Sequence, residues 1–289
     1  MCGYMAILFD SDDGSVDFVL HPTDLSEASL TAFHHALAIG IRYGAQFTLL
    51  HAVGRRSTDS WPGFPSVRDT LARWRKAGQT TDLEDGIRRS SISKVEVQVR
   101  DPVAASLGYI ERHAVDLIVM ATDDRRGLSR LVRAPRAEKL ARESKLATLF
   151  LPSGGRTFVS GRTGEVSLER ILVPVHPATD PRPAMLFAVR AAALLDDPSL
   201  EITLLHVGEG EESAIGDVPQ LPYCRWNVVR RAGDVVEQIL DLAEALPADA
   251  IVMSTAWQKS AARRVRGNVT ERVLQGAVCP LAAIPVDLD

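Results

Sequence analysis

Residues that could contact a ligand lie at the ends of four short apolar runs of this sequence and in the segments that follow them. In the first half the candidate residues are Pro22, Thr23, Asp24, Met120, Ala121 and Asp124, which lie at the ends of two such runs or just after them. In the second half the matching residues are Val175, His176, Met253, Ser254, Trp257, Gly267, Asn268 and Val269. If the runs are parallel strands, the first and fourth strands end together where the strand order reverses, which is where open α/β sheets bind ligands. The sequence therefore predicts two candidate pockets, one in each half.

Histidine and cysteine residues offer other chemistry, but their spacing favours structural roles. His51 and His206 end equivalent runs, and either could be catalytic or bind a metal. We favour a hydrogen bond that closes the strand, because no carboxylate or cysteine recurs beside them. His34 and His35 are adjacent on a predicted helix and point about 100° apart, so they cannot share one metal ion. With no Gly-x-Ser-x-Gly, Walker or His-Glu-x-x-His motif, and with Cys279 in a packing context, we predict no metal site and no catalytic residue.

Charge and composition exclude several classes of protein. The formal net charge is −4 and aromatic residues make up 6%, which leaves little to hold or stack a nucleic acid. The basic residues between Arg125 and Lys145 are interleaved with Glu138 and Glu143, as is typical of a solvated helix face. No apolar stretch approaches the ~18 residues of a membrane span, and three scattered cysteines suit a reducing compartment. We expect a cytoplasmic protein with no nucleic-acid and no membrane partner.

The two halves of the chain carry the same residues in the same order. Residues 19–22 align with residues 171–174, both ending in proline, and the Leu-Leu-His block at 49–51 aligns with the one at 204–206. From Asp101 onward the offset between the halves stays at 133 for about fifty residues, which chance does not readily produce. The chain of 289 residues is long enough for two domains of the same fold.

The aligned runs predict the elements of each half. The predicted strands are 18–22, 46–51, 94–99, 116–121 and 147–151, then 170–175, 201–207, 226–230, 250–254 and 281–285. The predicted helices are 26–43, one within 66–90, 101–112 and 135–144, then 183–195, 234–246 and 268–275. This alternation predicts an α/β fold in which each half is a doubly wound, five-stranded parallel sheet. The second half is 22 residues shorter between its second and third blocks, where we predict a loop in place of a helix.

We divide the chain into an N-terminal arm at 1–17, a first domain at 18–153, a linker at 154–168 and a second domain at 169–289. The linker is rich in glycine, serine and threonine. We expect Ala147-Leu151 and Leu281-Pro285 to pair and form an intramolecular pseudo-dimer, because pairing hides the free backbone groups of edge strands. Halves that fail to superpose, or one continuous sheet, would argue against the duplication.

These motifs together resemble the universal stress protein family. The matching segments are Val19 to Ser26, the Leu-Leu-His blocks, Arg231 to Asp234, Asp116 to Met120, and Cys279-Pro280. The resemblance implies two tandem Rossmann-like domains, of the adenine nucleotide alpha hydrolase-like kind, with strand order 3-2-1-4-5 and pairing through the last strands. In members that bind ATP, Gly-x-x-Gly, nine residues and then Gly-Ser or Gly-Thr follow the fourth strand. Glycines there let the backbone approach the phosphates, and the next helix offers free N–H groups.

When the first half is aligned with that pattern, the glycines of the pattern are replaced by other residues. Ala121 and Asp124 stand where the first two belong, and Ala134-Pro135 stands where Gly-Ser belongs. Asp124 adds negative charge beside the phosphates, and Pro135 lacks an N–H donor. Asp24, whose family counterpart contacts the base and ribose, is retained. The resemblance therefore implies a pocket that keeps its nucleoside half and has lost its phosphate half.

The second half departs differently. Ser254 and Trp257 replace the first two glycines, and His176 replaces the aspartate. Gly267-Asn268 remain at the phosphate end, but the indole of Trp257 would fill space that a triphosphate needs. We interpret both pockets as degenerate.

The resulting hypothesis is a tandem stress-response module that binds or signals, is not an enzyme and requires no cofactor. Its ligand would be an adenine nucleotide, ATP or AMP, if either pocket is still active. A protein partner and a homodimer of whole chains are further expectations that the sequence does not specify. One alternative is a regulatory switch gated by ATP or AMP, and another is a weak adenine-nucleotide hydrolase.

Overall fold

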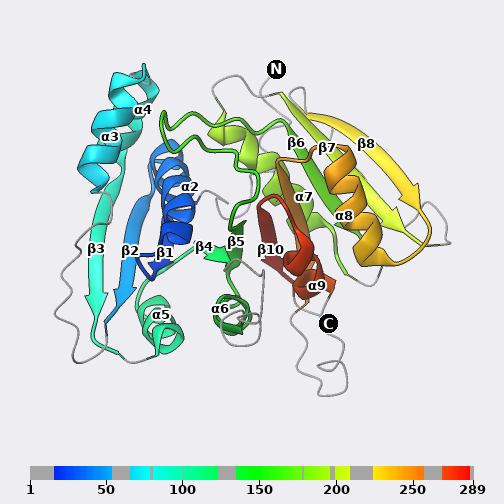
Figure 1. Ribbon diagram of the computed structural model, residues 1–289, viewed down its shortest axis with the longest axis horizontal. Coiled ribbons are helices and arrows are strands. Elements are labelled where there is room, and N and C mark those ends of the chain that lie inside the picture. The colour runs from blue at the N-terminus through cyan, green and yellow to red at the C-terminus, as the bar shows by residue number, and fades with distance from the viewer. Residues whose placement is uncertain are drawn as a thin grey trace, which may run out of the picture.

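Ten strands form one sheet with helices on both faces (Figure 1). The computed structural model describes residues 16–53, 66–78, 81–99, 101–122, 135–177, 179–195, 199–208, 224–256 and 269–286. The predicted arm therefore falls almost wholly outside the described residues. The domain boundaries given above stay a prediction.

The first half has the predicted α/β alternation. Its strands are β1 (Phe18–Thr23), β2 (Gln46–Ala52), β3 (Ser91–Val97), β4 (Leu117–Thr122) and β5 (Ala147–Pro152). Its helices are α2 (Glu27–Tyr43), α3 (Val67–Lys76), α4 (Thr81–Arg89), α5 (Pro102–Ile110) and α6 (Pro135–Ser144). The strands are parallel and lie in the order β3-β2-β1-β4-β5. The order 3-2-1-4-5 is confirmed, and it places the reversal between β1 and β4.

The second half repeats this arrangement. Its strands are β6 (Arg170–Val175), β7 (Leu200–Val207), β8 (Cys224–Arg231), β9 (Ala250–Thr255) and β10 (Leu281–Pro285). Its helices are α7 (Arg182–Arg190), the 3-10 helix η2 (Ala191–Leu194), α8 (Val235–Ala245) and α9 (Val269–Gly276). The order β8-β7-β6-β9-β10 is again 3-2-1-4-5, with parallel neighbours throughout.

Matched aspartates make matched contacts in the two halves. Asp116 accepts the backbone N–H of Phe18 at 2.8 Å, and Asp249 accepts that of Arg170 at 2.8 Å. Both carboxylates thereby fasten the fourth strand of a half to the start of its first strand. Asp101 and Asp234 likewise cap α5 and α8, each accepting an N–H of the first helical turn. The sequence repeat is therefore a repeat of local structure.

The two halves meet through the predicted strand pair. β5 and β10 run antiparallel, with Leu281 opposite Phe150 and Ala283 opposite Thr148. This pairing is confirmed, and it makes the sheet continuous. Continuity therefore does not argue against the duplication, contrary to the expectation above, because the continuous sheet contains two complete parallel units. Since strand direction reverses at the join, the carboxyl ends of the two units point in opposite directions there, and the two candidate pockets are separate.

The extra segment of the first half forms two helices rather than the one predicted within 66–90. α3 ends at Lys76, Ala77 is its C-cap, and Gly78 follows with φ +102°, a conformation that favours glycine and stops the helix from continuing. α4 then leads directly into β3, which begins at Ser91, three residues earlier than predicted. The loop predicted for the second half lies within 209–223, outside the described residues.

The predicted linker is packed against the helices of the first half. Phe158, Val159 and Leu168 are buried within the core layer that also contains α2 and α3. The ring of His35 accepts the backbone N–H of Val159 at 3.3 Å, and its other nitrogen bonds to the Thr31 carbonyl at 2.8 Å. These contacts fasten the connection between the halves to α2.

Candidate functional site

The end of β1 is tied to the start of α2 by short polar contacts. The hydroxyls of Thr23 and Ser29 are 3.0 Å apart, and the Leu25 N–H donates to the Thr23 hydroxyl at 3.1 Å. Asp24 is exposed, and one of its carboxylate oxygens accepts the N–H of Ser26, the residue that caps α2, at 2.9 Å. The other Asp24 oxygen makes no hydrogen bond within the described residues. Asp24 can therefore still accept a hydroxyl from a ligand at this edge.

The predicted residues of the first pocket come together in part. Because β1 and β4 are adjacent and parallel, Pro22, Thr23 and Asp24 lie at the same sheet edge as Met120 and Ala121. Thr23 and Met120 are buried, whereas Pro22 and Ala121 are half-buried. Asp124 lies outside the described residues, so the change at the phosphate end is not tested.

A buried histidine that the sequence analysis did not select lies at this reversal point. His21 is 0% exposed and lies just beyond the last paired residues of β1 and β4, Leu20 and Ile118. Its Nδ1 lies 2.8 Å from the Val119 carbonyl oxygen, which can only accept, so Nδ1 carries the proton. Its Nε2 is buried and has no partner within the described residues. Alignment with Val173 of the second half, an apolar residue, was the signal that could have revealed it.

The environment of His21 keeps its ring neutral. Burial lowers the pKa to about 4, against the smaller opposing effects of the Val119 carbonyl and the nearby Asp24 carboxylate. The ring therefore lies beside β4, bonded to Val119, without carrying charge at pH 7.

The two histidines at the ends of the second strands differ from each other. His51 bonds through Nδ1 to the Thr23 carbonyl at 2.8 Å, so the predicted closing hydrogen bond is confirmed there. His206 is only 5% exposed, and its Nδ1 has no hydrogen-bond partner in the described part of the chain. The same prediction is therefore wrong for this nitrogen of His206.

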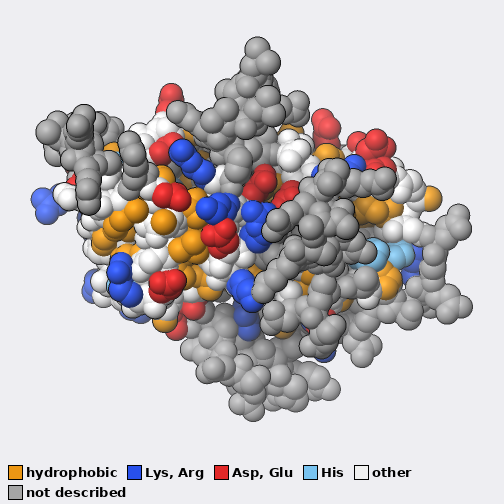
Figure 2. All heavy atoms as spheres, turned by 90° about the horizontal axis from the view of Figure 1, so that it is seen from below, with side chains coloured by type: hydrophobic (Ala, Val, Ile, Leu, Met, Phe, Trp, Pro, Cys, Tyr) orange, Lys and Arg blue, Asp and Glu red, His pale blue; other side chains and the backbone are white. Residues whose placement is uncertain are grey.

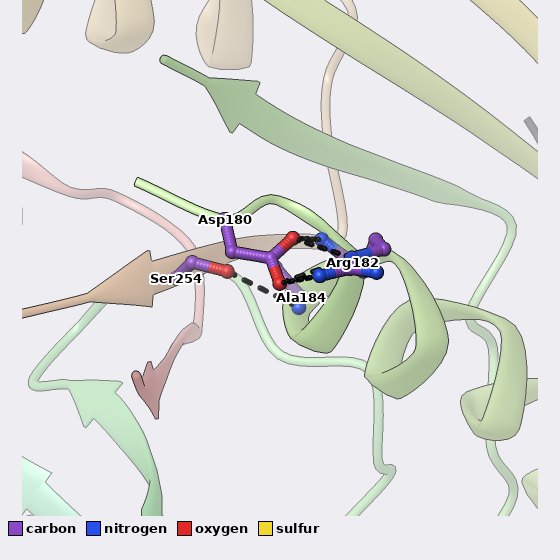
Figure 3. A network of polar contacts seen from close by, with 4 residues as sticks. All are labelled: Asp180, Arg182, Ala184 and Ser254. Carbon is purple, nitrogen blue, oxygen red and sulfur yellow. Dashed lines mark hydrogen bonds and ion pairs between the residues drawn. The ribbon is translucent and has the colours of Figure 1, made fainter. Parts of the chain in front are cut away.

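Ser254, the last but one residue of β9, caps α7 from another part of the chain (Figure 3). Its hydroxyl accepts the Ala184 N–H at 3.3 Å. The capping position of α7 is Pro181, which has no side-chain acceptor, so the first turn needs a partner from elsewhere. The Asp180 carboxylate accepts the neighbouring Arg182 N–H at 3.0 Å and pairs with its guanidinium at 2.7 Å. Ser254 is therefore already committed to a helix of its own chain.

Replacing Ser254 by alanine is expected to lower the free energy of unfolding by about 1 kcal/mol, the usual effect of losing a helix cap. Urea titration followed by circular dichroism measures the change. Ser91→Ala, at an exposed serine that begins β3, is the control and should stay within about 0.5 kcal/mol of the wild type. Equal effects of the two substitutions would contradict the capping role of Ser254.

The other predicted residues of the second pocket are only partly described. Val175 and Met253 are buried, while His176 is exposed in a turn in which the Thr179 N–H donates to its carbonyl at 3.0 Å. Val269 is exposed at the start of α9. Trp257, Gly267 and Asn268 lie outside the described residues. The predicted filling of this pocket by an indole therefore remains a prediction.

Charged and reactive groups elsewhere in the described chain are interleaved or buried. Arg142 of α6 pairs with Glu271 of α9 at 3.2 Å, and basic and acidic side chains are intermixed over the middle of the face in Figure 2.

Burial raises the pKa of the Cys279 thiol to about 11. No three described His, Cys, Asp or Glu side chains gather closely enough to hold a metal ion. Among the described helices, none is long and apolar enough to cross a membrane.

Known proteins share the sequence pattern and the fold of this chain. A model of the universal stress protein family matches residues 17–152 and 220–285. The crystal structure of a universal stress protein from Archaeoglobus fulgidus DSM 4304 is similar over 94% of this chain and 97% of its own, with 18% identity and a TM-score of 0.63. A functionally unknown protein from Pseudomonas aeruginosa PAO1 is similar over 94% of this chain and 93% of its own, with 14% identity and a TM-score of 0.61. No curated protein matches the sequence.

Proposed function

This chain belongs to the universal stress protein family, and on that premise we propose that it is a tandem stress-response module of the cytoplasm that binds or signals without catalysis. Its two nucleotide pockets are degenerate in this proposal. The proposed partner is a protein, and a homodimer of whole chains is compatible with the proposal.

One observation carries the proposal for the second half. Ser254 stands where the ATP-binding members of the family have a glycine, and its hydroxyl is bonded to the Ala184 N–H of α7 at 3.3 Å. A serine at that place adds a side chain where the backbone would otherwise approach a phosphate. The loss of the aspartate at His176 supports the same conclusion, because a histidine does not reproduce a carboxylate acceptor.

A specific observation favours the ATP- or AMP-gated switch as the second candidate, and only in the first half. Asp24 is exposed at the end of β1, with one carboxylate oxygen free of hydrogen bonds within the described residues. A carboxylate of this kind accepts a ribose hydroxyl. The nearby His21 ring is uncharged at pH 7, since burial lowers its pKa to about 4. This half could therefore retain affinity for a nucleoside.

Hydrolysis has weaker support than either of these. Of the two described cysteines, Cys279 lies beside a last strand, but it is buried and its pKa is raised to about 11, so it is not a thiolate nucleophile at pH 7. Phosphate release measured with excess ATP and magnesium tests this alternative directly. Turnover that depends on Asp24 would contradict the non-catalytic proposal.

Thermal-shift titration with ATP and AMP separates the module from the switch. A ligand present at 100 times its dissociation constant stabilises a protein by about 2.7 kcal/mol, which a melting curve resolves easily. We expect no saturable shift at millimolar ATP or AMP. A shift that Asp24→Asn removes, and that Asp241→Asn at an exposed aspartate of α8 leaves unchanged, would favour the switch instead.

A further inference from the structure

A small pocket lies away from the strand ends, between α2, α3 and the segment that connects the two halves (residues 154–168, here the connecting segment). Its volume is about 240 Å³, and its lining residues are Leu30, His34, Arg73, Gly161 and Arg162. No residue of the sheet lines it. It is therefore distinct from both candidate nucleotide pockets, which lie at the carboxyl ends of strands.

Two of the lining side chains carry guanidinium groups that have no carboxylate partner among the described residues. Neither Arg73 nor Arg162 makes an ion pair with a described acidic residue, although Arg75 on the same helix pairs with Glu84 and Arg88 pairs with Asp85. An arginine presents a planar set of donors that matches the oxygens of a phosphate or a carboxylate in a bidentate way. The pocket therefore has positive charge and guanidinium donors with no described carboxylate to balance them.

His34 holds one of these groups in place. Its Nε2 lies 3.4 Å from a terminal nitrogen of Arg73, which has only donors, so Nε2 accepts. Burial, and then the charge of Arg73, lower the pKa of His34 to about 4, so the ring is a neutral acceptor at pH 7. His34 thus orients a cation toward the pocket without adding a charge of its own.

The connecting segment completes the pocket through a close approach. A Cβ atom at position 161 would lie 2.7 Å from the Nδ1 atom of His34, so only glycine fits against that ring. The Gly161 carbonyl also accepts the indole N–H of Trp74 at 3.2 Å, which fixes the segment on α3. Since α3 belongs to the extra segment of the first half, the pocket depends on features that the chain does not duplicate.

We propose that this pocket binds a small oxyanion, either an organic phosphate or a dicarboxylate, held by the guanidinium groups of Arg73 and Arg162. The volume is below the roughly 300 Å³ at which pockets for drug-sized ligands begin, which favours a ligand of a few heavy atoms. Leu30 supplies an apolar wall for the carbon part of such a ligand. The site would let the module respond to a metabolite independently of any nucleotide.

Thermal-shift titrations with inorganic phosphate and with malonate, at constant ionic strength set by chloride, test the proposal on the full chain. At least one of the two anions should raise the melting temperature in a saturable way. Arg73→Gln and Arg162→Gln should each weaken that binding by about tenfold or more, because each loses a charged donor pair. Arg225→Gln, at an exposed arginine on β8 in the second half, makes the same charge change and should leave the binding unchanged.

The two anions distinguish the two ligand classes, since a response to phosphate alone indicates a phosphorylated ligand and a response to malonate alone a dicarboxylate. Arg162→Lys keeps the charge while removing the bidentate donor, so intermediate binding supports the assignment and also shows that the fold is intact. No saturable shift with either anion, or equal weakening by Arg225→Gln, would overturn it. Because Asp24→Asn should have no effect on these titrations, the test fails or succeeds separately from the proposed function.

Discussion

Between pH 6.5 and pH 4, the free energy of unfolding is expected to fall by about 3 kcal/mol more in the wild type than in a His21→Val variant. The unfolded chain has a histidine with the ordinary pKa of 6.5, whereas burial lowers the pKa of His21 in the folded protein to about 4. Below pH 6.5 the unfolded state therefore binds a proton that the folded state does not. Stability falls as the pH decreases through this window and levels off near pH 4, and valine has no such proton to bind.

Urea titrations at pH 7, 6, 5 and 4 measure this effect as the difference between variant and wild type. The absolute stability at pH 7 is a separate matter, because valine removes both the bond from Nδ1 to the Val119 carbonyl and the Nε2 atom, which has no partner among the described residues. Val19→Ala is the control, since this buried neighbour on β1 has no titratable group and should shift stability equally at each pH. A His21→Val difference that does not change with pH would contradict the neutral, buried state of His21.

Trp74→Ala should cost about 3–5 kcal/mol of unfolding free energy, the range for deleting a large aromatic side chain from a core. Trp74 is 1% exposed on α3, in the core layer that includes α2 and the connecting segment. Its removal would leave a cavity and also free the Gly161 carbonyl. The loss should appear in the main urea transition, because the indole packs into the core shared by both halves.

Trp74→Phe separates the two contributions to that loss. Phenylalanine retains most of the apolar contact but donates no hydrogen bond, so it should cost about 1–2 kcal/mol. Denaturant titration followed by far-ultraviolet circular dichroism compares the three proteins. A loss for Trp74→Ala smaller than the about 1–2 kcal/mol expected for Trp74→Phe would contradict this prediction. The extra segment of the first half would then be a separate unit rather than part of the core.

Much of the fold was predictable because the chain repeats short-range signals. Asp101 and Asp234 each begin a helix by bonding to its first turn, and such caps depend on residues two or three positions away. The apolar runs that become strands are equally local. The break at Gly78 was not predicted, because the helical spacing of Val67, Leu71 and Trp74 says where a helix lies but not that a second helix follows it.

The candidate sites were harder to predict, since their character depends on partners that are distant in the sequence. Ser254 is a candidate by sequence because it replaces a glycine, but its hydroxyl bonds to Ala184, seventy residues away. The sequence around His21 carries no motif that marks it, although the side chain lies at the reversal point and is bonded to Val119. The oxyanion pocket brings together residues of two helices and a segment predicted only as a linker.

The sequence by itself determined the family, the two parallel units and the edge strands that join them, because these follow from repeated patterns of apolar and capping residues along the chain. Only the tertiary structure decided which polar groups are available and which are already bonded. That question depends on desolvation and on hydrogen-bond distances between residues far apart in the chain, as at His21 and Ser254, and residue type alone does not contain them.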